Sequence, residues 1–270
     1  SRYLQTNSNL LASKTAEIVK KIELSKFKQF LLTTICIIIF SFIFCIPFLQ
    51  LIFWHFDNLE FNLINNLNLL LNSILIGICA ALVTVFFAIS LSLSYRGTNS
   101  LRYIISISSS GYSIPGSVIA AGLLVVFDVI FGTSITLYGI FGLLICLSIR
   151  FMTPAFNYIS SSLENISESS ERALSTKPKN SYRAFTLFYL PQVKPAIFLS
   201  IMIVFIESIK EQPATLLLRP VGFDTLSTKI YNFTSEGQWE LAASPSLLLI
   251  ILSLIFVYFI NKNIDLKNNF

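Results

Sequence analysis

The chain has 270 residues, of which 54% are hydrophobic, 12% are charged and 25 are Phe. A single soluble core cannot bury this much apolar surface, so the composition indicates a membrane protein with several transmembrane helices and excludes an ordinary soluble domain. The net charge of +5 does not indicate nucleic-acid binding, because most of the basic residues lie on one side of the predicted membrane.

The N-terminal segment, residues 1–29, is polar and lacks the features of a signal peptide. The chain starts with Ser1 rather than Met, so we expect it to be a fragment of a longer polypeptide. Residues 1–29 are then predicted to be a cytoplasmic N-terminal segment or a linker from the missing upstream part. The main domain is predicted to extend over residues 30–265. Four cysteines in apolar runs lack C-x-x-C spacing, which favours packing over a disulfide or zinc site: Cys36, Cys45, Cys79 and Cys146.

Six apolar runs approach the roughly 20 residues that a membrane-spanning helix needs. They cover about residues 30–53, 70–93, 104–128, 132–149, 192–212 and 246–261. The second and fourth contain Ser, Thr and Gly, which predicts contacts between helices. The third contains Gly111, Pro115 and a run of serines, so we expect it inside the bundle or beside a water-filled path. The predicted fold is an all-α, polytopic bundle of about six transmembrane helices.

The distribution of Lys and Arg predicts the orientation in the membrane. With a cytoplasmic N-terminus, all but three of the 19 basic residues lie in or beside cytoplasmic segments, and the exceptions are Lys210, Arg219 and Lys229. This bias fits the positive-inside rule and predicts that both termini are cytoplasmic. Arg150 is assigned to the cytoplasmic side in this scheme. Trp54 and Trp239 then fall near the outer interface, where aromatic rings concentrate.

A polar segment, residues 150–191, connects the fourth and fifth predicted spans and includes "SERALSTKPKNSYRAFTLFYLP". Two short helices are plausible in it, one in "SSLENISESSERALS" and one in "SYRAFTLFY". Pro191 and Pro195 fit the first turn of the following span. Such a helix pair can dock in a groove on a partner, and the alternative is a solvated loop.

This segment resembles the cytoplasmic coupling loop of binding-protein-dependent ABC importer permeases, whose pattern is E-A-A, three residues, G, nine residues, I-x-L-P. Leu190 and Pro191 match its ending, while Pro178 stands in place of the Gly and Glu171 stands one place before the E-A-A position. The resemblance implies contact with the ATPase through Glu168, Glu171, Arg172, Ala173, Leu174, Leu190 and Pro191.

Three further stretches are similar to segments of the ferric iron (Fe³⁺) permeases: "GYSIPGSVIAAGLL" (111–124), "IRFMTPAFNYISSSLENIS" (149–167) and the long stretch from "KEQPATLLLRP" to "SPSLLLI" (210–250). The resemblance implies an ABC importer type I permease fold in the bacterial inner membrane, with this chain as the C-terminal six-span half. The implied partners are ABC ATPase subunits, a periplasmic solute-binding protein, a second permease half and the lipid bilayer. No cofactor is expected.

The chain has no G-x-x-x-x-G-K-[ST] phosphate-binding loop, since none of its ten Gly precedes a Lys. We therefore expect it to be a permease and not an enzyme, with ATP hydrolysis on a partner subunit. His55 is the only His, which argues against a Ser-His-Asp triad and a multi-histidine metal relay. Its place beside Trp54 favours an interfacial role.

Polar residues within the predicted spans are candidates for the transport pathway or a gate, and each group has a structural alternative. For the residues of the third span the alternative is ordinary helix packing, and for Asp128 near its end it is an interfacial position. For the residues at the end of the fifth span the alternative is an ion pair between Glu207 and Lys210 within one helix. The candidates are Ser113, Pro115, Ser117, Asp128, Glu207, Lys210 and Glu211.

The segment between the fifth and sixth spans, residues 213–245, is too apolar for an idle loop, and we expect it to re-enter the outer leaflet. By resemblance it faces the binding protein, with Arg219, Asp224 and Lys229 as candidate contacts.

Three other functions compete with ferric iron import. A permease of the same build can carry another solute, such as thiamine, a phosphonate or a polyamine. An ion-driven secondary transporter would show inverted repeats, broken helices and buried ionisable residues, whereas the ionisable residues here fall at the ends of the predicted spans. A purely structural membrane subunit would not need the polar third span.

Overall fold

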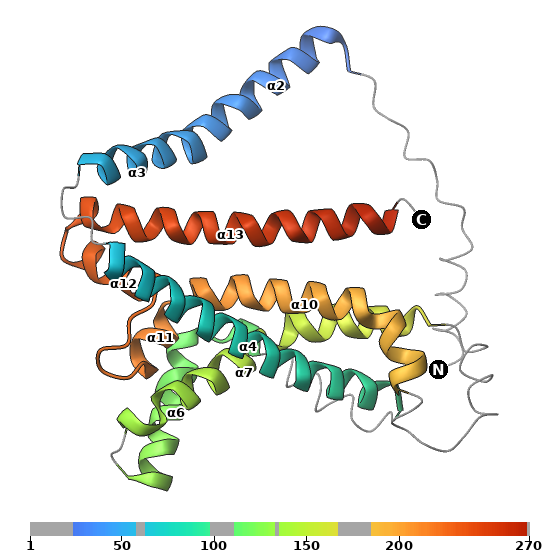
Figure 1. Ribbon diagram of the computed structural model, residues 1–270. Coiled ribbons are helices and arrows are strands. Elements are labelled where there is room, and N and C mark those ends of the chain that lie inside the picture. The colour runs from blue at the N-terminus through green and yellow to red at the C-terminus, as the bar shows by residue number, and fades with distance from the viewer. Residues whose placement is uncertain (1–23, 58–62, 98–110, 133–134, 167–184, 269–270) are drawn as a thin grey trace. The chain divides into compact units, whose positions relative to one another are not determined.

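The structure is a computed structural model that describes residues 24–57, 63–97, 111–132, 135–166 and 185–268. All regular elements within these ranges are helical, which confirms the predicted all-α class (Figure 1). In chain order they are α2 (Lys26–Phe40), η1 (Ser41–Cys45), α3 (Ile46–Asp57), α4 (Leu63–Gly97), η3 (Gly111–Ser113), α6 (Gly116–Phe131), α7 (Ile135–Glu164), η4 (Phe185–Tyr189), α10 (Leu190–Lys210), α11 (Pro213–Leu218), α12 (Leu226–Ser235) and α13 (Trp239–Asn268).

The helices reproduce the predicted membrane spans with different ends. Five stretches of the described residues are long and apolar enough to cross a membrane: Lys26–Asp57, Asn65–Tyr95, Gly139–Glu164, Thr186–Lys210 and Trp239–Lys262. The third predicted span corresponds to a shorter apolar helix, Gly116–Ile130. Residues 104–110, predicted as the beginning of this span, lie outside the described residues.

Helix α7 continues well beyond the predicted fourth span, so the expected beginning of the coupling loop at residue 150 was wrong. The helix extends to Glu164 because its buried face repeats every four residues, through Phe151, Ala155, Ile159 and Leu163. This face packs on α4 and α10. The sequence prediction ended the span where the apolar run gave way to polar residues, although the buried face of the helix continued.

The second helix predicted in the coupling loop is continuous with the next span over its described part. Phe185–Tyr189 form a π-helical turn, η4, that leads directly into α10. Pro191 lies at the beginning of α10, as predicted, whereas Pro195 lies inside the helix rather than in its first turn. Of the first predicted loop helix, residues 161–164 belong to α7 and residues 167–175 lie outside the described residues.

The chain divides into two compact units, Ser1–Gln50 and Leu51–Phe270. In the first unit α2, η1 and the beginning of α3 follow one another without a break. Phe40, Phe44 and Phe48 stack along this helix, with 5.3 Å and 5.7 Å between successive ring centroids.

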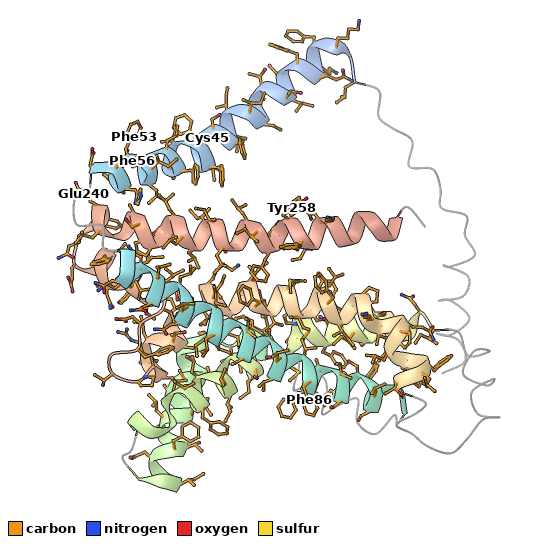
Figure 2. All side chains as sticks on the ribbon, in the orientation of Figure 1. Cys45, Phe53, Phe56, Phe86, Glu240 and Tyr258 are labelled. Carbon is orange, nitrogen blue, oxygen red and sulfur yellow. The ribbon has the colours of Figure 1, made fainter. Side chains whose placement is uncertain are left out.

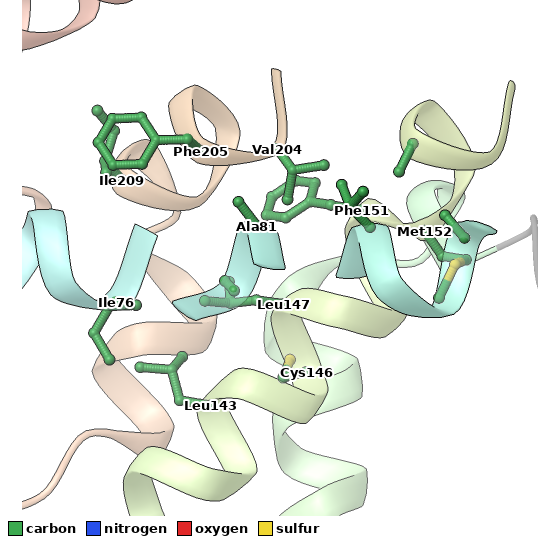
Figure 3. Packing of buried hydrophobic residues seen from close by; sticks show 14 of the residues in the cluster. Ile76, Ala81, Leu143, Cys146, Leu147, Phe151, Met152, Val204, Phe205 and Ile209 are labelled. Carbon is green, nitrogen blue, oxygen red and sulfur yellow. The ribbon is translucent and has the colours of Figure 1, made fainter. Parts of the chain in front are cut away.

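The core of the second unit lies among α4, α7 and α10, which pack against one another (Figure 3). Phe151, Leu147 and Phe205 are fully buried there. Gly77 lets α4 approach α10 closely, because a Cβ at this position would lie 2.8 Å from Cγ2 of Ile209. The small residues of the second span therefore serve helix contacts, as predicted. The buried ones are Ser73, Ala80, Ala81, Thr84, Ala88 and Ser92.

The remaining helices of this unit surround that core. Helices α6 and α11 pack on α7, α12 packs on α13 and α4, and α13 packs on α10, where Phe205 and Phe256 stack with centroids 4.0 Å apart. Large apolar side chains such as Phe86 and Tyr258 remain exposed (Figure 2). A bundle with apolar residues on its exterior is expected where lipid or another membrane subunit is the neighbour.

Candidate functional site

The described part of the third predicted span begins with irregular backbone, residues 111–115, which precedes α6 and is called the break below. Gly111–Ser113 form one 3₁₀ turn, closed by the Ile114 amide donating to the Gly111 carbonyl at 3.3 Å, and α6 starts only at Gly116. Pro115 explains the interruption, because proline has no amide hydrogen and disfavours a helical conformation in the residue before it. Ser113 and Pro115 are exposed at this break, whereas Ser117 is half-buried in the first turn of α6.

One short stretch of α7 holds the break at three points. A Cβ on Gly111 would collide with the carbonyl oxygen of Ile149, so only glycine allows the backbone to approach α7 here. Nη1 of Arg150 lies 3.5 Å from the carbonyl oxygen of Ile114, and Sγ of Cys146 lies 3.8 Å from that of Gly116. The irregular backbone is thus held against α7 on one side, while residues 112–115 remain exposed.

An ion pair lies at the same place. Nε of Arg150 is 3.2 Å from Oε2 of Glu211, the residue that follows α10. The Glu211 side chain is only 6% exposed, and it is the one acidic or basic residue that is buried among those the structure describes. Its Oε1 has no hydrogen-bond partner. A Cβ on Gly116 would collide with this oxygen, so the glycine leaves the space that the carboxylate occupies.

The position of Arg150 corrects two predictions. Arg150 does not begin a cytoplasmic loop, and it lies inside α7, at the depth where α10 ends. Ionisable residues are therefore not confined to the ends of the spans. Sequence reasoning missed Arg150 as a site residue because an arginine at the edge of an apolar run fits the positive-inside pattern. The four-residue repeat of buried positions that continues past it was the available signal.

The other ionisable candidates of the spans do not join this pair. Glu207 and Lys210 form the predicted pair within α10, with Nζ 2.9 Å from Oε1, and their side chains are 33% and 45% exposed. Asp128 is exposed near the end of α6, where its backbone oxygen accepts a hydrogen bond from the Gly132 amide. Of the predicted pathway residues, the structure brings Glu211 alone to the break that contains Ser113 and Pro115.

The segment after α10 is folded against the bundle, which supports the expectation that it is not an idle loop. Helix α11 starts beside the Arg150–Glu211 pair and packs on α6 and α7, with Ala214, Thr215 and Leu218 buried. Its end lies beside Gly139, where an added Cβ would lie 2.6 Å from the Leu218 carbonyl oxygen. The segment therefore runs along α7 over about 16 Å.

The three predicted binding-protein contacts lie near one another. Arg219 forms an ion pair with Asp224, and burial lowers the pKa of the Arg219 guanidinium from its usual value. Arginine nevertheless stays protonated, so its partly buried charge needs this carboxylate. Nζ of Lys229 lies 4.5 Å from the centre of the Phe233 ring.

Asp224 and Lys229 also line a polar pocket of about 220 Å³ whose wall includes three asparagines of α4. Nδ2 of Asn72 donates to the Asp224 backbone oxygen at 2.9 Å, which fixes one side of the pocket. Sequence reasoning missed the asparagines, because polar residues at the start of a span are ordinary. The pocket is lined by Asn65, Asn68, Leu69, Asn72, Gly222, Asp224 and Lys229.

No group of three or more His, Cys, Asp or Glu side chains that could hold a metal ion occurs among the described residues. Nδ1 of His55 lies 2.8 Å from Oγ of Ser244 on α13. Trp54 and Trp239, predicted at one interface, line a common pocket of about 450 Å³.

Residues 73–268 match the binding-protein-dependent transport system inner membrane component. The chain belongs to this family. It is thus a permease component of the ABC importer type, as the sequence resemblance implied.

Two curated relatives and one solved structure show how far the likeness extends. The Fe(3+)-transport system permease protein FbpB 2 of Haemophilus influenzae is 28% identical over 199 residues, which are 71% of this chain and 38% of that protein. A candidate 2-aminoethylphosphonate transport system permease protein, PhnV of Salmonella typhimurium, is 26% identical over 196 residues, 70% of this chain and 71% of that protein.

The solved structure is a bacterial alginate ABC transporter in complex with its alginate pentasaccharide-bound periplasmic protein. It aligns with a TM-score of 0.63 at 17% identity, over 87% of this chain and 93% of the aligned one. At that identity the likeness establishes the fold of a permease. The chain spans less than two fifths of the ferric permease relative.

The predicted ATPase contacts of this permease are only partly described. Leu190 is half-buried and Pro191 exposed at the beginning of α10. The others lie outside the described residues: Glu168, Glu171, Arg172, Ala173 and Leu174.

Proposed function

We propose that the chain is one half of the permease of an ATP-driven importer of ferric iron. The observation that carries this proposal is the 28% identity to an Fe(3+)-transport system permease over 199 residues of a chain that belongs to the permease family. Because this chain matches 38% of that relative, the second permease half is proposed to be fused upstream in the same polypeptide.

The proposed coupling mechanism depends on the polar segment that connects α7 and α10. Both helices adjoin the polar segment around Glu171, which is the proposed docking site for the ATPase subunits. Closure of these subunits on ATP displaces the segment, and α7 and α10 carry the displacement into the membrane. Arg150 lies in α7 and Glu211 follows α10, so the displacement reaches the broken third span.

In this proposal Fe³⁺ passes through the permease without being bound tightly at a permanent metal site. Fe³⁺ is a hard cation that suits carboxylate and phenolate oxygen, and the described residues contain no cluster of three His, Cys, Asp or Glu side chains. Tight binding is therefore assigned to the periplasmic protein. Its proposed docking surface is the polar pocket with Asp224 and Lys229, together with the adjacent Arg219.

A phosphonate is the second candidate cargo, because the 2-aminoethylphosphonate permease relative is matched over 71% of its own length. An ion-driven secondary transporter is disfavoured. The irregular backbone before α6 and the Arg150–Glu211 pair with its buried carboxylate are features that such transporters also have. Membership of a binding-protein-dependent family outweighs them, since it predicts an external binding protein.

The test uses the full-length permease with its ATPase and binding protein in proteoliposomes, and follows uptake of labelled Fe³⁺ with and without ATP. We expect ATP-dependent iron uptake that excess 2-aminoethylphosphonate does not reduce. The double variant Glu171→Lys/Arg172→Glu should abolish uptake and co-purification of the ATPase. Lys262→Glu, an exposed reversal on α13, is the control and should leave both intact.

Three outcomes would overturn parts of the proposal. Uptake without any ATPase would point to a secondary transporter. ATP-driven uptake of labelled 2-aminoethylphosphonate but not of Fe³⁺ would reassign the cargo. Unchanged uptake in the double variant would make the polar segment a solvated loop.

A further inference from the structure

Two interruptions of regular backbone meet at the Arg150–Glu211 pair. One is the break in the third span between Gly111 and Gly116. The other is in α7, where Pro154 lacks the amide that would bond to the carbonyl of residue 150. Such positions let a helix bend at low cost. The backbone thus lacks regular helical hydrogen bonds on two sides of the pair.

The pair connects three separate elements at this place. Arg150 belongs to α7, its Nε contacts Glu211 after α10, and its Nη1 points to the carbonyl oxygen of Ile114 in the break. The carboxylate in turn lies against Gly116, at the N-terminus of α6. A carboxylate is favourable there, because the first amides of a helix have no internal acceptors.

The cost of burial indicates that the pair has a purpose beyond stability. Replacing a buried ion pair by apolar residues is often neutral or stabilising, while removing one partner is strongly destabilising. Oε1 of Glu211 is buried without a hydrogen bond, which adds to the cost of burying the carboxylate. Buried ionisable groups within membrane proteins commonly mark the moving or conducting parts.

We infer that Arg150 and Glu211 are positioning residues of the gate: their pairing holds the beginning of α6 against α7 in the state described here. This inference rests on the proposed transport function and specifies how the motion of α7 and α10 reaches the third span. When α7 and α10 move relative to one another, the pair separates and α6 is released. Gly116 is the residue whose lack of a side chain allows the contact.

Cys146 provides a reporter that does not depend on transport. Its thiol is fully buried and lies 3.8 Å from the Gly116 carbonyl oxygen, so α6 shields it. In a background in which Cys36, Cys45 and Cys79 are replaced by Ala, the rate of maleimide labelling of Cys146 measures how often the start of α6 leaves α7. The experiment uses the full-length permease, and labelling is measured on its folded, monodisperse fraction.

We expect Arg150→Gln and Glu211→Gln each to raise the labelling rate about tenfold or more, because the first leaves the buried Glu211 carboxylate unpaired and the second leaves the partly buried Arg150 unpaired. The double variant Arg150→Gln/Glu211→Gln should be labelled more slowly than either single variant. This non-additivity distinguishes a pair from two independent structural residues.

A steric variant tests the same contact without removing a charge. Gly116→Ala places a methyl group where Oε1 of Glu211 lies and should raise the labelling rate. Gly122→Ala is the matched control in the same helix, because a Cβ there has no atom within 4 Å, and it should not change the rate. If the charge variants give no folded protein, the comparison of these two alanines decides alone.

Failure of this inference can be told apart from failure of the proposed function. Equal labelling in Gly116→Ala and Gly122→Ala, or additive effects of the two charge variants, would overturn the inference even if Fe³⁺ uptake is normal. Absence of Fe³⁺ uptake in the unmodified permease would overturn the cargo, while the labelling pattern would still test the pair.

Discussion

Single glycines decide how closely the helices of this permease approach. At Gly77 an added Cβ would lie 2.8 Å from Ile209 and 2.9 Å from the ring of Phe205, which is 1% exposed. Because neighbours on all sides hold that ring, it cannot move away without disturbing the core. An added Cβ at Gly122, by contrast, would have no atom within 4 Å. Position, rather than residue type, therefore determines the effect of a substitution.

We predict that Gly77→Ala lowers the free energy of unfolding by about 1–3 kcal/mol, the usual cost of overpacking a core. Gly122→Ala should leave it unchanged or raise it by up to about 1 kcal/mol, because alanine favours a helix. The measurement is thermal unfolding of the purified permease in detergent. Equal unfolding temperatures for the two variants would show that α4 and α10 can separate without cost.

At the scale of helices, the sequence predicted the five helices that are long and apolar enough to cross a membrane, but not how α7 and the third span are built. Apolar runs report that a segment can be buried, and this was enough to find the spans. The length of α7 depended on a face that repeats every four residues while polar residues occupied the other faces. That arrangement lowers the average hydropathy where the helix continues.

The candidate site could be predicted only in part, for the same reason. Pro115 and its glycines made the third span irregular in the sequence, and the structure has a break there. Glu211 was found as an ionisable residue near the end of a span. Its partner Arg150 was not, because pairing depends on the relative depth of two helices that lie far apart in the chain. Periodicity within one segment carries no information on that depth.

The start of α12 shows how a single cap can fix an element of the proposed docking surface. The Thr225 side chain accepts from the Thr228 amide, and the Thr228 hydroxyl accepts from the Thr225 amide at 2.9 Å. Both residues are buried, and the next amide, of Leu226, donates to Ser73 Oγ on α4 at 2.8 Å. The cap therefore also attaches α12 to the bundle.

We predict that Thr225→Ala destabilises α12 by about 1 kcal/mol, because it leaves the Thr228 amide without its acceptor. Hydrogen exchange followed by mass spectrometry should show faster exchange in peptides from α12, with α10 unchanged. Ser235→Ala is the control, since it removes an exposed hydroxyl that bonds only to the Asn232 carbonyl at the other end of the helix. Protection of α12 equal to that of the control would mean that packing on α13 alone fixes it.

At the scale of the whole molecule, the family fold determines the relative directions of the helices, and the sequence predicts their absolute orientation. Helix α7 ends at Glu164 and α10 begins at Leu190, and the two helices run antiparallel, so these two helix ends lie on the same side. The turn before α13, with Gln238, follows α10 and belongs to the opposite side. The excess of Lys and Arg assigns the first side to the cytoplasm.

A pair of single cysteines tests that orientation in intact cells, with the four native cysteines replaced by Ala. Glu164→Cys and Gln238→Cys both place the thiol at an exposed position, so any difference in labelling reports the side of the membrane. We expect a membrane-impermeant maleimide to label Gln238→Cys in intact cells and Glu164→Cys only after permeabilisation. The reverse pattern would invert the topology, and the polar segment would then be unable to reach an ATPase in the cytoplasm.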